Sequence, residues 1–408
     1  MIARSACGLT IRLVILLAIS AIGLSARCAE AKDSVIPGAG DDGFISCSIL
    51  AVSPGAEIYQ VFGHALVRME CPSEGLDFVF TFESNGDRSV WHNFLYGSEG
   101  MVVAVETDRF LRDIAEEGRG VTSYFLNLSP RQKQELWREL DGLIAMPPVV
   151  FDIRQANCMA KVLWAIQAAV SPDSIGMVAS NLRDIDNAAM MDHVIGENRP
   201  WAALAYKIGT GAGCDDVDSW MTRTTPVLFP EIYGELRITS PDGESRPLVA
   251  GKPVSLLEQR SDFSFAGVRP VAAAELFALF VALLCVVDMA GCCRMAVVIA
   301  DGILLVLQTA AAVVLMFLAL APHGIGAGWN WYLLVFNPLP FALWLILRRS
   351  EWMGKVYVFY AVWLFAFAVV APILTSEVDA TGVIVVSALA MRCAVKFVMF
   401  LRGRGCGR

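Results

Sequence analysis

Five apolar segments in the last third of the chain limit what it can fold into more than any other feature. They are residues 271–289, 295–320, 331–347, 356–374 and 380–401. Each is about as long as a helix that crosses the hydrocarbon core of a bilayer, which is about 30 Å thick. The chain is 56% hydrophobic and only 18% charged, so we predict a membrane protein with an all-α bundle of about five transmembrane helices.

The basic residues between these segments predict the orientation of the bundle. They lie in the first and third connections and after the last segment: Arg294, Arg348, Arg349, Lys355, Arg402, Arg404 and Arg408. The second and fourth connections, residues 321–330 and 375–379, contain none. Because basic residues stay on the cytoplasmic side, the C-terminus is predicted to be cytoplasmic and residues 32–265 to lie outside the cytoplasm.

The N-terminus independently predicts export. Arg4 and Arg12 precede the apolar residues 13–24, and small residues follow, as in a secretory signal peptide. We expect cleavage after Ala31, with an uncleaved anchor as the alternative. The expected domains are therefore residues 1–31 as signal, 32–265 as an exported, periplasmic domain and 266–408 as the transmembrane domain of a bacterial inner-membrane protein. A net charge of −8 without a basic surface argues against nucleic acid as a partner.

The sequence pattern of the exported part predicts an α+β domain. Residues 44–52, 58–69 and 76–82 have the pattern of three strands in a meander, and residues 124–128 that of another strand. Helices are predicted over residues 108–117 and 130–145, the second capped by Ser129 with Pro130 in its first turn.

Cys158 and His64 are the candidates for covalent chemistry. Cys158 follows Asn157 and is the first residue of a predicted apolar helix, where free backbone N–H groups favour the thiolate form. The alternative to a nucleophile is that Cys158 is simply a small buried residue of the core. His64 follows Phe62-Gly63 on a predicted strand and has the chemistry of a general base; the alternative is an ordinary strand histidine. Histidine and cysteine spacings typical of zinc sites are absent, so we expect no metal or cofactor. Because the periplasm is oxidising, a disulfide between Cys47 and Cys71 is an alternative to two free thiols.

Several ordered motifs carry a resemblance to the bacterial lipoprotein N-acyltransferases of the Lnb type. It covers most of residues 44–345, and its parts are residues 53–68 with His64, Gly118-Arg119, residues 126–129, Asn157-Cys158, residues 206–230, His323, Trp329-Asn330-Trp331 and Asn337-Pro338. The resemblance implies a circularly permuted papain-like (NlpC-like) exported domain in which histidine precedes cysteine. The sequence of this chain differs from the family pattern at residues 154–156 and 81–83, which are expected to lie beside the pocket.

The activity implied by this resemblance is two-step acyl transfer. Cys158 as nucleophile and His64 as base would take an acyl chain from a membrane phospholipid and pass it to the α-amine of a diacylglyceryl-cysteine lipoprotein. Candidates to orient His64 or hold the oxyanion are Tyr59, Glu70, Asp77, Glu83 and Asn157. Candidates for substrate binding are Arg68, His323, Trp329 and Asn330.

Two other classes of function use the same sequence features. A cysteine hydrolase, either a phospholipase or a cell-wall amidase or peptidase, would need the same pair with water or a peptide as the other reactant. A non-catalytic membrane scaffold would need neither residue. Charged residues inside the spans are also candidates for function: Asp288, Arg392 and Lys396 lie near cytoplasmic ends, where long side chains can reach the interface, and Asp301 lies deeper.

Overall fold

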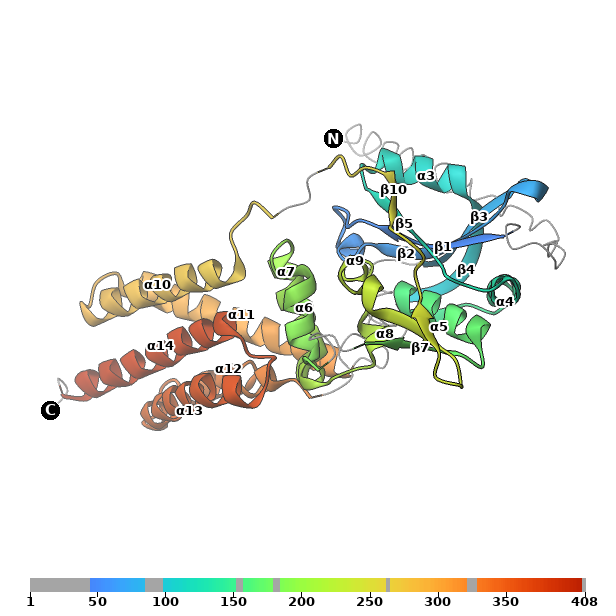
Figure 1. The fold of residues 1–408 in the computed structure, drawn as a ribbon. Coiled ribbons are helices and arrows are strands. Elements are labelled where there is room, and N and C mark those ends of the chain that lie inside the picture. The colour runs from blue at the N-terminus through green and yellow to red at the C-terminus, as the bar shows by residue number, and fades with distance from the viewer. Residues whose placement is uncertain are drawn as a thin grey trace, which may run out of the picture. The chain divides into compact units, whose positions relative to one another are not determined.

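The computed structural model describes residues 45–84, 98–151, 157–178, 184–261, 265–320 and 329–405. The predicted signal peptide and His323 lie outside these residues. The described chain is a mixed α+β domain followed by a helical region (Figure 1). The α+β class predicted for residues 32–265 and the apolar helices predicted after them are both confirmed.

The α+β domain is built on an antiparallel sheet that has seven strands within the described residues, in the order β10-β5-β1-β2-β3-β4-β6. The strands are β1 (Ser46–Val52), β2 (His64–Cys71), β3 (Leu76–Ser84), β4 (Ser98–Glu106), β5 (Val121–Phe125), β6 (Val149–Phe151) and β10 (Val254–Leu257). The predicted meander is present as β1, β2 and β3. Its second strand begins later than expected, because residues Ile58–Gln60 form a 3₁₀ turn, η1.

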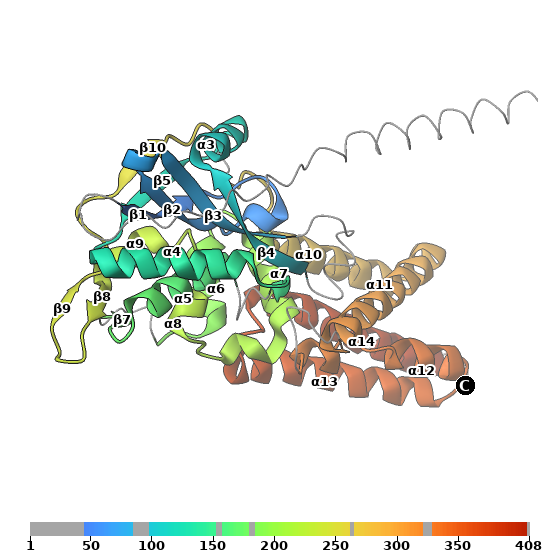
Figure 2. The same ribbon diagram turned by 90° about the vertical axis from the view of Figure 1, so that its right-hand side faces the viewer.

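Helices cover both faces of this sheet (Figures 1 and 2). One face carries α3 (Thr107–Glu116), and the other carries α4 (Pro130–Ile144) and α5 (Cys158–Val170). Side chains alternate along β2, so Ala65, Val67 and Met69 join the core with α5, while Leu66 packs with α3. The predicted cap of α4 is confirmed, since the Ser129 side chain accepts a hydrogen bond from the Gln132 N–H.

The remaining elements before the membrane helices are short. They are η2 (Pro72–Glu74), β7 (Ser174–Met177), α6 (Asn187–Ile195), α7 (Pro200–Thr210), η3 (Gly211–Asp215), α8 (Trp220–Arg223), α9 (Phe229–Ile232), η4 (Tyr233–Glu235), β8 (Leu236–Thr239) and β9 (Ser245–Pro247). Strands β7, β8 and β9 form a second antiparallel sheet.

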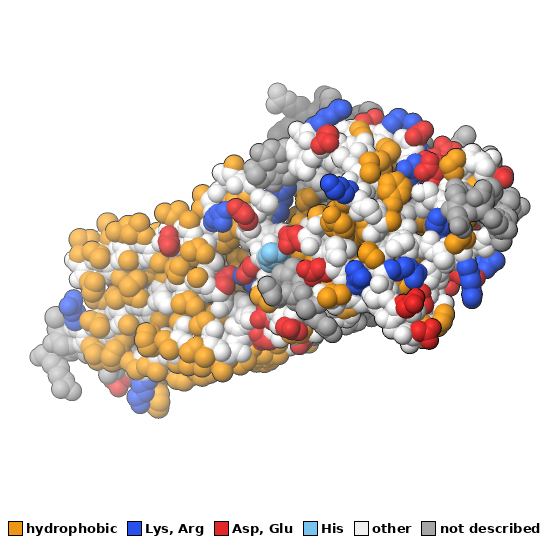
Figure 3. All heavy atoms as spheres, viewed as in Figure 1, with side chains coloured by type: hydrophobic (Ala, Val, Ile, Leu, Met, Phe, Trp, Pro, Cys, Tyr) orange, Lys and Arg blue, Asp and Glu red, His pale blue; other side chains and the backbone are white. Residues whose placement is uncertain are grey.

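Four of the five predicted spans are long apolar helices. They are α10 (Pro270–Met289), α11 (Arg294–Leu320), α13 (Trp352–Leu374) and α14 (Ala380–Gly405). Hydrophobic side chains cover this helical region, whereas charged side chains gather over the residues that precede it (Figure 3). By length and composition these four helices are able to cross a membrane.

The third predicted span differs from a continuous helix. It consists of a 3₁₀ turn, η5 (Trp331–Leu334), and α12 (Leu339–Leu347), which has nine residues and is only about 14 Å long. The cause lies at Asn337-Pro338, where the Asn337 amide donates to the Leu333 and Leu334 carbonyls and its oxygen accepts from the Leu339 N–H. Proline has no N–H for the helix ladder, so the helix starts again after it.

Polar contacts join α7 and η3 to loops of the helical region. The ammonium of Lys207, which is 4% exposed, lies 2.8 Å from Asp379 and 3.1 Å from Asp192. Asn330 donates to the Ile208 carbonyl, and the Ser376 N–H donates to Asp215. A buried ammonium with two carboxylate partners ties residues 192–215 to the connection between α13 and α14.

Candidate active site

Cys158 is the first residue of α5, as the sequence predicts, and Asn157 caps that helix. The Asn157 side-chain oxygen accepts from the Ala160 N–H at 2.9 Å, and its amide donates to the Thr222 carbonyl at 2.6 Å. Asn157 is buried. Asn157, which we considered for the oxyanion, therefore has a structural role. Its amide group holds the start of α5 against the segment that contains Thr222.

The Cys158 thiol lies where backbone N–H groups converge. Burial raises the pKa of the thiol, and the N–H groups of Ala65, Met159 and Cys158 itself lower it by a smaller amount. Within the described residues the N–H groups of Cys158 and Met159 donate no backbone hydrogen bond, as expected for the first turn of a helix. The thiol is therefore protonated at neutral pH and needs a base to become a nucleophile.

His64 is placed at the start of β2 by the glycine before it. Gly63 has a φ of +73°, and a Cβ atom there would lie 2.4 Å from the Val52 carbonyl oxygen. Glycine accepts both constraints because it has no Cβ. His64 then pairs opposite Val52 on β1, and the N–H of the next residue, Ala65, is close enough to the Cys158 thiol to lower its pKa. The backbone that follows His64 thus lies beside the Cys158 thiol at one end of the sheet.

The imidazole of His64 is oriented by Thr81. Nε2 of His64 lies 2.6 Å from Oγ1 of Thr81, whose side chain is buried on β3. Among the described residues Nδ1 has no hydrogen-bond partner, and His64 and Cys158 are not hydrogen-bonded to each other. Burial, and to a lesser degree the charge of Arg119, lowers the pKa of His64 to about 4. The ring is therefore neutral at physiological pH, with Nδ1 available to take a proton.

None of the carboxylates considered for orienting His64 contacts it in the described structure. Asp77 holds Arg68 through two hydrogen bonds of 2.7 and 2.6 Å, and Glu70 lies 3.4 Å from the same guanidinium. The guanidinium of Arg68, which we considered for substrate binding, is therefore already paired with these two carboxylates. Burial raises the pKa of the Glu83 carboxyl. The orienting group is the Thr81 hydroxyl, which the sequence reading missed.

The remaining candidates lie in other contacts. Tyr59 is in η1 with a side chain that is 75% exposed. Asn330 is buried, donates to the Ile208 carbonyl and accepts from the Tyr332 N–H, so it supports the loop. Trp329 is half exposed beside Trp331 and accepts from the Ala212 N–H through its carbonyl. These contacts do not bring Trp329 or Asn330 to the thiol.

Lys161 is a second residue that the sequence reading missed. It lies three residues after Cys158, and therefore on nearly the same side of α5. Its Nζ lies 5.8 Å from the Phe82 ring centre and 5.3 Å from that of Trp164, and burial lowers its pKa. It forms no ion pair within the described part of the chain. The helical spacing from Cys158 was the signal that could have identified it.

The exported cysteines are free thiols in the structure. Cys47 and Cys71 are both buried and unpaired with each other, and Cys158 and Cys214 are likewise free. The Cys158 thiol is therefore not consumed by a disulfide with Cys214. In the described residues no group of three or more His, Cys, Asp or Glu side chains is arranged to hold a metal ion.

Two family models match the chain. One describes the Lnb N-terminal periplasmic domain and matches residues 44–186; the other describes the Lnb transmembrane domain and matches residues 259–404. No curated protein and no solved structure matches the chain. The first model includes His64, Thr81, Cys158 and Lys161, and the second includes the four long apolar helices.

A periplasmic domain followed by a transmembrane domain fits an inner-membrane protein whose N-terminal domain lies outside the cytoplasm. This agrees with the orientation predicted from the basic residues in the connections. The resemblance based on ordered motifs is confirmed, and the chain belongs to the Lnb family.

Proposed function

We propose that this protein is an N-acyltransferase that moves an acyl chain from a phospholipid, through a thioester on Cys158, to the α-amine of a diacylglyceryl-cysteine lipoprotein. The observation that carries the proposal is the position of the Cys158 thiol at the start of α5, beside the N–H of the residue that follows His64. Membership of the Lnb family and the membrane helices support a lipid substrate over a soluble one.

The first half-reaction cleaves the phospholipid ester. Nδ1 of His64 takes the thiol proton while the Cys158 sulfur attacks the ester carbonyl carbon, so a C–S bond forms. The tetrahedral intermediate collapses with cleavage of the ester C–O bond. The imidazolium returns its proton to the leaving alkoxide, which departs as a lysophospholipid. Thr81 keeps Nε2 engaged, so that Nδ1 is the nitrogen that exchanges the proton.

The oxyanion of each tetrahedral intermediate needs two donors. The N–H groups of Cys158 and Met159 are free of backbone partners and lie at the sulfur, so they are our candidates. They also lie at the positive end of the α5 dipole, which stabilises negative charge.

The second half-reaction forms the amide. The neutral α-amine of the lipoprotein cysteine attacks the thioester carbonyl, and a C–N bond forms as the C–S bond breaks. His64 removes a proton from the attacking nitrogen and delivers it to the departing Cys158 thiolate, which restores the resting enzyme. Lys161 is our candidate for holding the donor phosphate, because its ammonium forms no ion pair within the described residues and lies one helical turn from Cys158.

A defined reaction tests this proposal. Purified full-length protein in phospholipid vesicles would receive a donor with an isotopically labelled acyl chain and a synthetic diacylglyceryl-cysteine peptide. We expect mass spectrometry to find the label in an amide on the peptide. Labelled free fatty acid without labelled peptide would instead support a phospholipase. No reaction of either substrate would support a scaffold.

We expect the first half-reaction to lose rate as the pH falls through about 4. Burial lowers the pKa of His64 to about 4, so the ring stays neutral above that pH and becomes a cation, unable to accept the thiol proton, below it. The measurement is single-turnover release of lysophospholipid against pH without acceptor peptide, because the acceptor amine has its own ionisation near pH 8. An acid limb near pH 6.5, the ordinary pKa of histidine, would contradict a base whose pKa is lowered.

Thr81 provides the matched variants for the same assay. Thr81→Val removes the hydroxyl that engages Nε2, so we expect a loss of roughly ten- to a hundredfold, less than the loss of roughly a hundredfold or more that follows removal of a general base. Thr81→Ser keeps the hydroxyl and should stay near the wild-type rate. A full rate in Thr81→Val would show that the Thr81 contact does not orient the base.

A further inference from the structure

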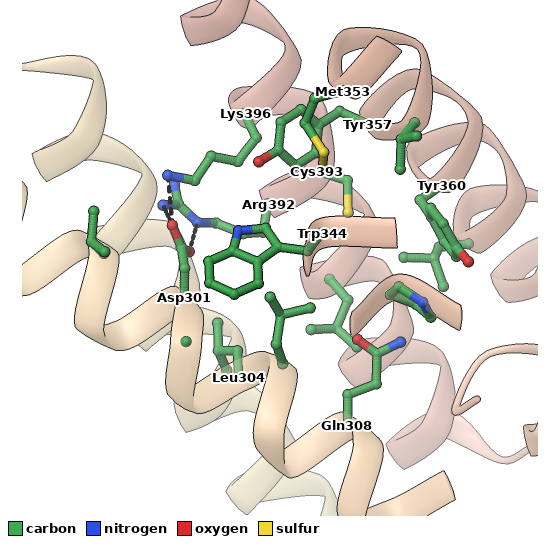
Figure 4. A pocket seen from close by; sticks show the side chains of 17 residues that line it. Asp301, Leu304, Gln308, Trp344, Met353, Tyr357, Tyr360, Arg392, Cys393 and Lys396 are labelled. Atoms are coloured by element: carbon green, nitrogen blue, oxygen red, sulfur yellow. Dashed lines mark hydrogen bonds and ion pairs between the residues drawn. The ribbon is translucent and has the colours of Figure 1, made fainter. Parts of the chain in front are cut away.

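A cavity lies among α11, α12, α13 and α14, within the membrane part of the chain (Figure 4). Its volume is about 340 Å³, and its lining includes Asp301, Gln308, Trp344, Tyr360, Arg392 and Lys396. Small-molecule sites in proteins have volumes of about 300–1,000 Å³, mostly apolar walls and a few polar groups at fixed positions. This cavity has that composition, and it is separate from the elements that carry Cys158 and His64.

One end of the cavity is charged. Asp301 binds Arg392 through two hydrogen bonds of 2.8 and 2.9 Å and lies 2.5 Å from the Lys396 ammonium (Figure 4). Asp288 lies 2.9 Å from Arg392 and 3.0 Å from Lys396 but does not line the cavity. The lining therefore contains two cations and one carboxylate, and with Asp288 the whole cluster carries no net charge.

The cations keep donor capacity for a ligand. Among the described residues Nη1 of Arg392 contacts only the Cys285 sulfur, at 3.9 Å. An ammonium has three donors, and Lys396 has two carboxylate partners. A phosphate oxygen is the acceptor that suits an arginine and a lysine side by side.

The charged end lies at the cytoplasmic face. The periplasmic domain precedes α10, so α10 ends on the cytoplasmic side, and Asp288 is its second-to-last residue. Arg392 and Lys396 contact Asp288, so their charged groups lie near the cytoplasmic end of α10, from where long side chains reach the headgroup region. From there the cavity runs inward along α11 from Asp301 to Gln308, about 10 Å toward the bilayer centre.

A charged end at headgroup depth and an apolar end that points inward match the shape of a lipid. We propose that this cavity binds one glycerophospholipid of the cytoplasmic leaflet, with its phosphate at Arg392 and Lys396 and one acyl chain in the apolar part. The apolar part is formed by Leu305, Trp344, Tyr360, Leu364 and Leu389. The site is independent of the acyl donor, which the reaction requires at the opposite face of the membrane.

Gly302 allows this site to be tested without breaking the ion cluster. It lines the cavity, and a Cβ atom added there would meet no atom within 4 Å. Gly302→Phe therefore fills the cavity, and the loss of a mid-helix glycine favours the helix. Ile303→Phe is the matched control, because Ile303 is the next residue, is 54% exposed and does not line the cavity.

The experiment is native mass spectrometry of delipidated full-length protein titrated with an ether-linked phosphatidylglycerol, which cannot donate an acyl chain. We expect Gly302→Phe to bind one lipid fewer than wild type, or to bind it at least tenfold more weakly, while Ile303→Phe binds as wild type does. Arg392→Gln should weaken the phospholipid at the same site.

Two further ligands separate the headgroup from the chain. Ether-linked diacylglycerol lacks the phosphate and inorganic phosphate lacks the chain, so we expect both to bind at least tenfold more weakly than the phospholipid. Equal binding of diacylglycerol would overturn the role of Arg392 and Lys396. Equal lipid counts and affinities in Gly302→Phe and Ile303→Phe would overturn the site itself.

Discussion

Cys158→Ala should lower acyl transfer by about four or more orders of magnitude, the loss that follows removal of the nucleophile in enzymes that work through covalent intermediates. Alanine cannot form the thioester, and the remaining N–H donors cannot replace that step. Cys158→Ser should be nearly as inactive, because the neutral base faces a hydroxyl whose proton is much harder to remove than that of a thiol. The measurement is labelled-acyl transfer to the diacylglyceryl-cysteine peptide.

A matched cysteine controls for side effects of this substitution. Cys292 is an exposed free thiol in the turn between α10 and α11, so Cys292→Ala should keep the wild-type rate. In cells whose only copy of this protein carries Cys158→Ala, the third acyl chain should disappear from the N-terminal peptides of lipoproteins. Triacylated lipoproteins at wild-type levels in such cells would rule out the transferase.

Gly63→Ala should destabilise the exported domain by roughly 2–4 kcal/mol. A positive φ costs alanine about 1–2 kcal/mol, and a Cβ atom 2.4 Å from the Val52 carbonyl oxygen forces the backbone to move as well. Within the described strands Val52 is paired on both sides, with His64 and with Val121, whereas His64 is paired on one side only, so His64 is the residue that shifts. A displacement of about 1 Å at a reacting group can cost a hundredfold in rate, so activity should fall with stability.

Gly75→Ala separates the cost of a positive φ from the cost of the clash with the Val52 carbonyl oxygen. Gly75 also has a positive φ, of +62°, but a Cβ atom there meets nothing within 4 Å. We expect it to cost about 1 kcal/mol, from the φ alone, and to leave the rate unchanged. Thermal unfolding of both variants in the same detergent, followed by single-turnover rates, makes the comparison. Equal losses for the two glycines would mean that the Val52 contact does not position His64.

The parts of the fold that were predictable are those that depend on local chemistry. Asn157 before an apolar run marks the start of α5, and Ser129-Pro130 marks the start of α4, because capping is decided by a few adjacent residues. The location of the N-terminal domain outside the cytoplasm was predictable because basic residues recur in every second connection.

The residue that orients His64 was not predictable for a physical reason. Thr81 faces His64 because the turn at residues 72–75 pairs Cys71 with Leu76 and therefore Leu66 with Thr81. A shift of one residue in that register would turn a different side chain toward the imidazole. The three carboxylates we considered were chosen by charge, which says nothing about register.

The third apolar segment illustrates the limit of hydropathy. Residues 331–347 are apolar apart from Asn337, as predicted, but they form a 3₁₀ turn and a short helix instead of one continuous helix, because the Asn337 side chain replaces helical hydrogen bonds with its own. An average over many residues does not register one side chain that ends a helix.

The Lys207 contact has a consequence for how the protein can be handled. A fragment that ends near residue 265 would retain Cys158 and His64 but lose Asp379, one of the two carboxylates beside a buried ammonium. It would also lose Asn330, the donor to the Ile208 carbonyl. The membrane half is thus a folding partner of the half that carries Cys158 and His64, and a water-soluble fragment is a poor substitute for the intact chain.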